Sequence, residues 1–181
     1  MADALPTFVY HPDPIATGTV VATDETCDCC RRVRGFKCDG PSYGEHDLEV
    51  ICPWCIADGT AHDRFGATFM DRDGIGDYGH WGAVPDDVRD LIAYRTPCFT
   101  GWQQERWWAC CNDAGVFLGH AGKAELEAYG EQAIAAIRTE AGCADDDWQW
   151  YLDALDKDDG PTAYVFRCRH CGTLGGYSDC H

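Results

Sequence analysis

Three pairs of cysteines in this 181-residue sequence have the spacing Cys-x-x-Cys. They are Cys27 with Cys30, Cys52 with Cys55, and Cys168 with Cys171. Two residues between cysteines form a turn that brings both sulfurs to one metal ion. A tetrahedral zinc site with Zn–S bonds of about 2.3 Å places its sulfurs about 3.8 Å apart. Each pair therefore supplies half of a zinc site, and a second pair must complete it.

The first two pairs lie close to the usual spacing of C-x₂-C…C-x₂-C zinc sites. We therefore expect Cys27, Cys30, Cys52 and Cys55 to bind one zinc ion. Cys29 competes with Cys30 within the sequence CDCC. The two-residue gap between Cys27 and Cys30 matches that of the partner pair, so Cys29 is expected to be a spare thiol.

The sequence CPWC, residues 52–55, has a second interpretation as a redox-active dithiol. In thioredoxin-like proteins such a motif precedes a helix whose N-terminus stabilises the first thiolate. Here Gly59 follows too soon for a long helix, and another cysteine pair stands at the spacing of a zinc site. These features favour a metal-binding turn.

The third pair is followed by Gly172, which suits the left-handed backbone of a metal-binding turn. Its partner is ambiguous from the residues alone. The candidates are Cys110 with Cys111, or one of these two with Cys180, His120 or His170. Adjacent residues in a strand point to opposite faces, so Cys110 and Cys111 can bind one ion only where the backbone is kinked.

Short strands and about three helices are expected to position these cysteines. Strands are expected at residues 19–24 and 47–52, each before a cysteine pair, and at 162–168 before the third pair. Helices are expected at residues 85–95, 123–140 and 145–159 from proline, acidic first turns and apolar spacing. Residues 102–108, WQQERWW, contain three tryptophans that we expect in the core; the alternative is a groove in which they stack on a ligand.

Together these elements predict an α+β fold in which small zinc-ribbon-like β elements, with two cysteine-zinc sites, pack with the helices. The length suits a single domain, residues 1–181. We expect zinc site 1 within residues 19–60, a helical middle at 84–158, and zinc site 2 joining 102–120 to 162–181.

The charge of the chain restricts its partners. With 31 acidic and 14 basic side chains, the formal net charge is −17. Nucleic-acid backbones are bound by neutralising them with Lys and Arg. We therefore expect no nucleic-acid partner and a protein partner with a basic surface. Residues 31–37, RRVRGFK, are a local exception whose charges are expected to balance nearby thiolates and acids.

The cysteine content and the start of the chain indicate a compartment. The first residues show neither the basic region nor the apolar region of a signal peptide. No apolar run approaches the roughly 18 residues needed to cross a bilayer. We expect a cytoplasmic protein without membrane insertion, where thirteen cysteines are better explained by metal than by disulfides.

With these motifs in hand, the chain resembles the CbrC family, small bacterial proteins named for a colicin-tolerance protein. The resemblance covers most of the chain. It rests on residues 5–18 (LPTFVYHPDPIATG), 27–30 (CDCC), 52–59 (CPWCIADG), 96–111 (TPCFTGWQQERWWACC), 117–122 (FLGHAG) and 164–172 (YVFRCRHCG). The family has no established biochemical activity, so the resemblance implies metal binding and, through its name, a stress or toxin-tolerance response.

The resemblance also suggests the ligands of the second site. The family pattern has His-Cys-x-x-x-Cys near that site, whereas this chain has Cys110 at the histidine position and Gly115 at the second cysteine position. The resemblance then implies that Cys110 replaces the missing ligand. The resulting set is Cys110, Cys111, Cys168 and Cys171.

These observations predict a zinc-binding interaction module with two Zn²⁺ per chain and no catalytic residues. The alternative is an enzyme, either a zinc-dependent hydrolase or a thiol-redox enzyme acting through CPWC. The sequence lacks H-E-x-x-H, and it lacks the H-x-E and P-C-x-x-C pair of the deaminases. Two all-cysteine sites also leave no position open for a catalytic water.

Overall fold

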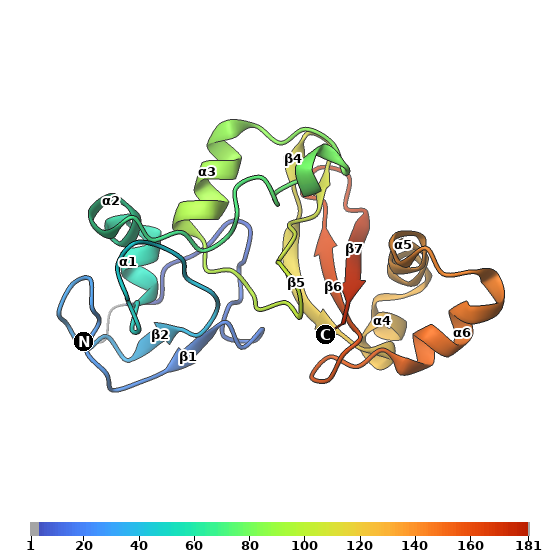
Figure 1. Cartoon of the computed structure of the whole chain (residues 1–181), viewed down its shortest axis with the longest axis horizontal. Helices are drawn as coiled ribbons and strands as arrows, with labels where there is room; N and C mark the ends of the chain where they lie inside the picture. The colour runs from blue at the N-terminus through green and yellow to red at the C-terminus, as the bar shows by residue number, and fades with distance from the viewer. Residues whose placement is uncertain (1–3, 181) are drawn as a thin grey trace.

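The computed structural model describes residues 4–180 and has the mixed α+β architecture that the sequence predicts. A three-stranded antiparallel sheet stands in the middle of the molecule (Figure 1). The N-terminal elements lie on one side of it and three C-terminal helices lie on the other. No helix among the described residues is both long and apolar enough to cross a membrane.

The N-terminal part begins with a hairpin of two short strands. Strand β1 (Val20–Ala22) pairs antiparallel with β2 (Phe36–Cys38), which confirms the centre of the strand predicted at residues 19–24. Helices α1 (Pro53–Ala57) and α2 (Thr60–Phe65) follow, and neither was predicted. Helix α3 (Asp86–Arg95) agrees with its prediction, and a single 3₁₀ turn (Asp77–Gly79) precedes it.

The strand predicted at residues 47–52 is wrong, because this segment is irregular. The side chain of Asp28 accepts hydrogen bonds from the backbone N–H groups of Glu49 and Val50, at 3.0 and 2.9 Å. These two donors are therefore bound by a carboxylate from the cysteine turn instead of a neighbouring strand.

The central sheet is formed by β5 (Val116–Ala121), β6 (Thr162–Arg167) and β7 (Leu174–Asp179), in the order β5-β6-β7. Strand β6 confirms the strand predicted before the third cysteine pair. A minimal hairpin of β3 (Ala109–Cys110) and β4 (Asp113–Ala114) precedes the sheet. Residues 102–108 are irregular apart from an isolated bridge between Trp107 and Ile75, and β3 begins directly after them.

Two helices replace the single helix predicted at residues 123–140. Helix α4 (Lys123–Tyr129) and helix α5 (Glu131–Ala141) meet at Gly130, whose φ of 93° is outside the helical region. Helix α6 (Asp145–Ala154) occupies most of the range predicted for the last helix. Figure 1 shows α5 beside β7, and α4 and α6 lie on the same side of the sheet as α5.

Buried side chains form two hydrophobic clusters. One extends from Phe8 and the N-terminal cysteines to the aromatic face of the central sheet, and the other lies between the sheet and helices α4–α6. Trp107 is fully buried in the first cluster, as expected for a core tryptophan. Trp102 is 40% exposed, so the three tryptophans of this segment do not share one environment.

Candidate metal centres

The structure brings Cys27, Cys30, Cys52 and Cys55 together, with all four sulfurs within 4.8 Å of one another. The Sγ atoms of Cys27 and Cys55 are 3.9 Å apart, as are those of Cys30 and Cys52. A tetrahedral ZnS₄ site requires about 3.8 Å. We call these four residues cluster 1, and their spacing fits one zinc ion.

The CDCC half of cluster 1 is a turn in the loop between β1 and β2. The N–H of Arg31 donates to the carbonyl of Cys27 at 2.9 Å, and the N–H of Cys27 donates to the carbonyl of Arg32 at 3.0 Å. Arg31 has a φ of 57°, the left-handed conformation that often ends such a turn. These bonds point the thiols at the two ends of the turn toward one position.

The CPWC half of cluster 1 lies at the start of a helix. Cys52 is the N-cap of α1, and Cys55 is inside this helix of five residues, which ends before Gly59 at φ 83°. The N–H of Cys52 donates to Sγ of Cys27 at 3.3 Å. A helix does therefore begin at CPWC, as in redox motifs, but both thiols face the CDCC turn and are 1% and 2% exposed.

Cys29 lies outside cluster 1, although it is only 3% exposed. Its hydrogen bond with Cys27 is the largest influence on its thiol and helps raise the pKa of Cys29 to about 12. The four sulfurs that lie within 4.8 Å of one another include that of Cys30 and not that of Cys29, so the geometry favours Cys30 as the fourth ligand.

The second group, cluster 2, consists of Cys110, Cys111, Cys168 and Cys171, with all sulfurs within 4.8 Å. Sγ of Cys110 is 3.7 Å from that of Cys111 and 3.8 Å from that of Cys171. Within the described residues, Cys180, His120 and His170 are not in this group. His120 instead contacts the carbonyl of Thr100 at 2.9 Å.

A tight turn supplies the kink that two adjacent cysteine ligands need. Cys110 pairs with Asp113 across the β3–β4 hairpin, and the two residues between them both have positive φ, 54° for Cys111 and 61° for Asn112. Two consecutive left-handed residues are typical of a type I′ hairpin turn. The turn rotates Cys111 out of the alternation of a strand.

The other half of cluster 2 repeats the turn of CDCC at the β6–β7 hairpin. The N–H of Gly172 donates to the carbonyl of Cys168 at 3.1 Å, and the N–H of Cys168 donates to the carbonyl of Thr173 at 2.8 Å. Gly172 has a φ of 76°, as its type predicts. Hydrogen bonds with the side chain and backbone of Thr173 lower the pKa of Cys171 to about 6.

Asp113 connects both halves of cluster 2 to the N-terminal segment. Its carboxylate accepts the O–H of Tyr10 at 2.7 Å and lies 2.8 Å from Nε2 of His170 and 3.4 Å from Nη1 of Arg169. Burial alone would raise the pKa of Asp113, but its hydrogen bonds and the charge of Arg169 outweigh burial and lower it. Sequence reasoning missed this residue, whose only signal is its position two residues after Cys111.

The two clusters differ in exposure. In cluster 1, Cys27, Cys52 and Cys55 are buried and only Cys30 is partly exposed. In cluster 2, Cys111 and Cys171 are exposed, Cys110 is partly exposed and Cys168 is buried. Water and small reagents therefore reach the sulfurs of cluster 2 more easily.

Comparison with known proteins finds a family and no solved structure. Residues 5–180 match the model of the family described as "Uncharacterised protein family (UPF0167)". The chain is 43% identical over 182 residues to the UPF0167 protein Mb2317 of Mycobacterium bovis, an alignment that covers 97% of this chain and 93% of the relative. It is 40% identical over 174 residues to the UPF0167 protein PA1536 of Pseudomonas aeruginosa, with 95% of both chains covered. No solved structure matches.

Proposed function

The chain belongs to the uncharacterised protein family UPF0167, and we propose that it is a zinc-binding protein whose two four-cysteine clusters each hold one Zn²⁺. The ligands would be Cys27, Cys30, Cys52 and Cys55 in cluster 1, and Cys110, Cys111, Cys168 and Cys171 in cluster 2. The observation that carries this proposal is the convergence of four sulfurs in each cluster, all within 4.8 Å of one another, with two Sγ–Sγ pairs per cluster at 3.7–3.9 Å. Four thiolates without a carboxylate suit zinc in a closed, structural role.

Zinc in these positions would hold the fold together. Cluster 1 joins the β1–β2 loop to helix α1, and cluster 2 joins the β3–β4 turn to the β6–β7 turn. Binding of structural zinc contributes about 10–16 kcal/mol in small zinc-binding domains, whereas whole domains are stable by about 5–15 kcal/mol. We infer that the chain folds as a single domain, residues 1–181, only when metal is present; the hydrophobic cluster that extends from Phe8 to Tyr177 supports one domain.

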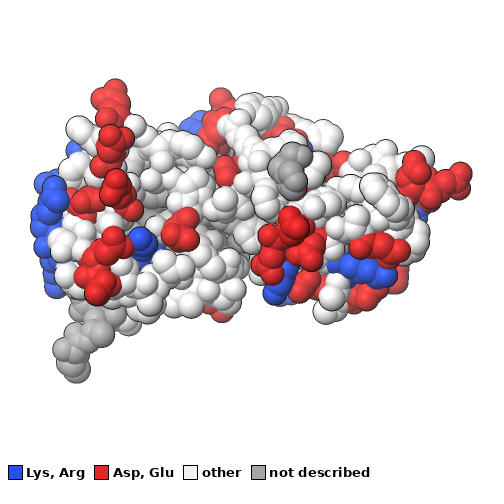
Figure 2. All heavy atoms as spheres, turned by 60° about the horizontal axis from the view of Figure 1, so that its bottom comes forward, with Lys and Arg blue, Asp and Glu red and all other residues white. Residues whose placement is uncertain are grey.

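An interaction module is the role that we propose for this scaffold, without catalytic residues. Figure 2 shows several groups of acidic side chains on the face that it draws, with basic side chains in fewer places. A net charge of −17 favours a protein partner with a basic surface and disfavours nucleic acid. Binding to such a partner should weaken as salt rises; binding that is insensitive to salt, or tight binding to DNA at physiological salt, would contradict this role.

We also propose that the family named here and the CbrC family, which the motifs of this chain resemble, are the same group. On that basis a cytoplasmic role in a bacterial stress or toxin-tolerance response is proposed. The enzymatic alternatives have less support. A thiol-redox enzyme needs free, accessible thiols at Cys52 and Cys55, but these are 1% and 2% exposed, and a hydrolase needs an open ligand position that four sulfurs do not leave.

Metal analysis of purified protein tests the proposal. We expect two zinc ions per chain in the natural protein and one in each of the variants Cys27→Ser and Cys168→Ser. The paired control is Cys143→Ser, which changes a partly exposed cysteine outside both clusters and should keep two ions. A metal-free protein that unfolds cooperatively, or disulfides within the clusters, would contradict the proposal.

A further inference from the structure

A polar hollow of about 270 Å³ lies beside the loop that carries the sequence WQQER. It is lined by Tyr43, Thr68, Asp71, Gln104 and Glu105. A second hollow of about 350 Å³ shares two of these residues and is lined by Tyr78, Gln103, Gln104, Glu105 and Arg106. Neither hollow includes a cysteine of the two clusters, so they are separate from the proposed zinc sites.

Glu105 is a buried carboxylate that has no cationic partner among the described residues. Glu105 is 6% exposed. Its Oε1 accepts a hydrogen bond from the N–H of Gly101 at 3.0 Å, and its Oε2 accepts one from the O–H of Tyr43 at 3.3 Å. Burial raises the pKa of Tyr43 to about 12, so the phenol is the donor. Over residues 4–180, no ion pair joins Glu105 to a Lys, Arg or His, although buried charges are normally paired.

Burial of a carboxylate is not by itself the sign of a ligand here. Asp179 is 8% exposed and also binds neutral donors, the O–H of Tyr164 at 2.7 Å and the N–H of Gln103 at 3.3 Å. Glu105 differs because it lines both hollows, one of them together with a second carboxylate, that of Asp71.

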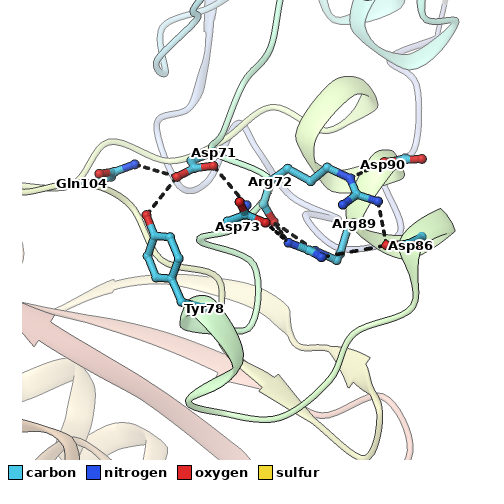
Figure 3. Close-up of polar contacts among 8 residues, drawn as sticks. All are labelled: Asp71, Arg72, Asp73, Tyr78, Asp86, Arg89, Asp90 and Gln104. Atoms are coloured by element: carbon cyan, nitrogen blue, oxygen red, sulfur yellow. Dashed lines mark hydrogen bonds and ion pairs between the residues drawn. The ribbon is translucent and has the colours of Figure 1, made fainter.

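Asp71 also lacks a cationic partner among the described residues. Its Oδ2 accepts hydrogen bonds from the O–H of Tyr78 at 2.9 Å and from Nε2 of Gln104 at 3.1 Å (Figure 3). The two arginines drawn in the figure have other partners: Arg72 pairs with Asp86 at 2.7 Å and Asp90 at 2.6 Å, and Arg89 pairs with Asp73. Arg106, which lines the second hollow, pairs with Asp77. The hollow is therefore lined by two carboxylates that no Lys, Arg or His of the described chain pairs with.

We propose that this hollow binds a primary alkylammonium group. Such a group has three N–H donors. Three residues that line the hollow carry acceptor oxygens: the carboxylates of Glu105 and Asp71, and the side-chain amide of Gln104, whose Nε2 donates to Asp71. The half-exposed ring of Tyr43, 51% exposed, adds an aromatic wall that favours a cation.

The size and ligand count favour an organic cation over a metal ion. A volume of about 270 Å³ lies just below the usual range of roughly 300–1,000 Å³ for small-molecule pockets, so it fits a side-chain-sized group. Calcium needs six to eight oxygen ligands. Within the described chain, the only groups of three or more candidate metal ligands are the two cysteine clusters. The inference goes beyond the proposed zinc function and does not depend on it.

Two-dimensional ¹H–¹⁵N NMR of the zinc-loaded chain, titrated with n-butylammonium chloride at physiological salt, tests the site. We expect saturable shifts of the Gly101 amide and of the Gln104 side chain. Glu105→Gln and Asp71→Asn should each weaken binding about tenfold or more, since each removes a charged hydrogen-bond partner. The control Asp146→Asn makes the same charge change on an exposed position of α6 and should bind as the natural protein does.

The source of the ammonium group is distinguished by a second ligand, the peptide acetyl-Gly-Gly-Lys-Gly-Gly-amide. Binding of this peptide at the same residues, lost on acetylation of its lysine, would support a Lys side chain of a partner; binding of n-butylammonium alone would support a free amine. Equal shifts with n-butanol, or equal binding by Glu105→Gln, Asp71→Asn and Asp146→Asn, would overturn the proposal. Because zinc content is measured on the same samples, this failure is distinct from failure of the metal sites.

Discussion

The thiols of Cys110 and Cys111 lie 3.7 Å apart and face the same cluster, although these residues are adjacent in the chain. In a regular strand the two side chains would point in opposite directions. The positive φ of Cys111, 54°, and of Asn112, 61°, makes this convergence possible. Cluster 2 therefore depends on the conformation of one turn as much as on the identity of its cysteines.

Replacing Asn112 by valine should disturb this turn. A β-branched residue is strained at φ 61°, and the left-handed conformation costs about 1–2 kcal/mol in an L-residue. We expect Asn112→Val to lower the free energy of unfolding by about this amount, measured by denaturant titration of the zinc-loaded protein. Asn112→Gly is the matched control and should be neutral or slightly stabilising. Equal losses in both variants would show that backbone strain is not the cause.

Asp113→Asn should weaken cluster 2 without affecting cluster 1. The carboxylate positions Tyr10 and His170, and loss of a charge-assisted hydrogen-bond network costs about 1–3 kcal/mol. We expect a roughly tenfold or larger loss of zinc affinity at one of the two sites, measured by competition with a chelator. Asp147→Asn, on the exposed start of α6, is the control. Unchanged affinity at both sites would mean that Asp113 has no role in holding the cluster.

Cys29 and Cys30 should differ sharply when each is changed to serine. Cys30 belongs to cluster 1, whereas Cys29 lies beside it as a hydrogen-bond partner of Cys27. We expect Cys30→Ser to contain one zinc ion per chain and Cys29→Ser to contain two, measured by native mass spectrometry. The reverse result would assign the tighter Cys-x-Cys arrangement to this site.

The thiols of cluster 2 should react before those of cluster 1. Cys111 and Cys171 are exposed, whereas Cys52 and Cys55 are 1% and 2% exposed. With 4,4′-dithiodipyridine in excess, we expect two phases of zinc release, the faster one disappearing in Cys168→Ser. Fast modification of Cys52 and Cys55 while zinc is bound would contradict the structural role of CPWC and favour its redox interpretation.

His11 should make the stability of the protein depend on pH. The imidazole is fully buried between the carbonyl of Pro97, at 2.8 Å, and the hydroxyl of Thr17, at 2.7 Å. Burial lowers the pKa of His11 to about 4 from an ordinary value near 6.5. The folded state therefore binds this proton less readily than the unfolded state does. The contribution of neutral, buried His11 to the free energy of unfolding is therefore complete above about pH 6.5 and is lost as the pH falls toward 4.

The size of this effect can be measured as a difference between two proteins. Between pH 7.5 and 5.5, His11 should reduce the free energy of unfolding by roughly 1 kcal/mol. The variant His11→Asn should be less stable at every pH because it loses the edge contact with Phe117. It should lack the decrease in stability between pH 7.5 and 5.5 that His11 causes in the natural protein. Comparing the two proteins removes the acid sensitivity of the zinc sites, which both share. Parallel pH profiles would exclude His11 as the origin.

Local patterns in the sequence predicted the parts of the site that depend on neighbouring residues. The spacing of Cys27 and Cys30, and the glycine after Cys171, determine turns that the structure contains. The long-range parts were harder to predict. The pairing of Cys110 with the β6–β7 turn depends on a hairpin of two-residue strands, and no periodicity extends over so short an element.

The fold shows the same division between local and tertiary causes. Strand β6 and helices α3 and α6 follow from their own residues, whereas the strand expected at residues 47–52 is replaced by bonds to the side chain of Asp28. The break at Gly130 was visible as a glycine within a helical pattern, but its φ of 93° depends on how α4 and α5 pack. The Asp113 network joins residues 10, 113 and 170, which only the folded chain brings together.

X-ray absorption at the zinc edge tests the central claim most directly, because it reports the atoms bound to the metal. For protein that contains two zinc ions per chain, we predict four sulfur neighbours at about 2.3 Å and no nitrogen or oxygen neighbour. A light-atom ligand at about 2.0–2.1 Å, or an average of fewer than four sulfurs, would contradict two closed four-cysteine sites.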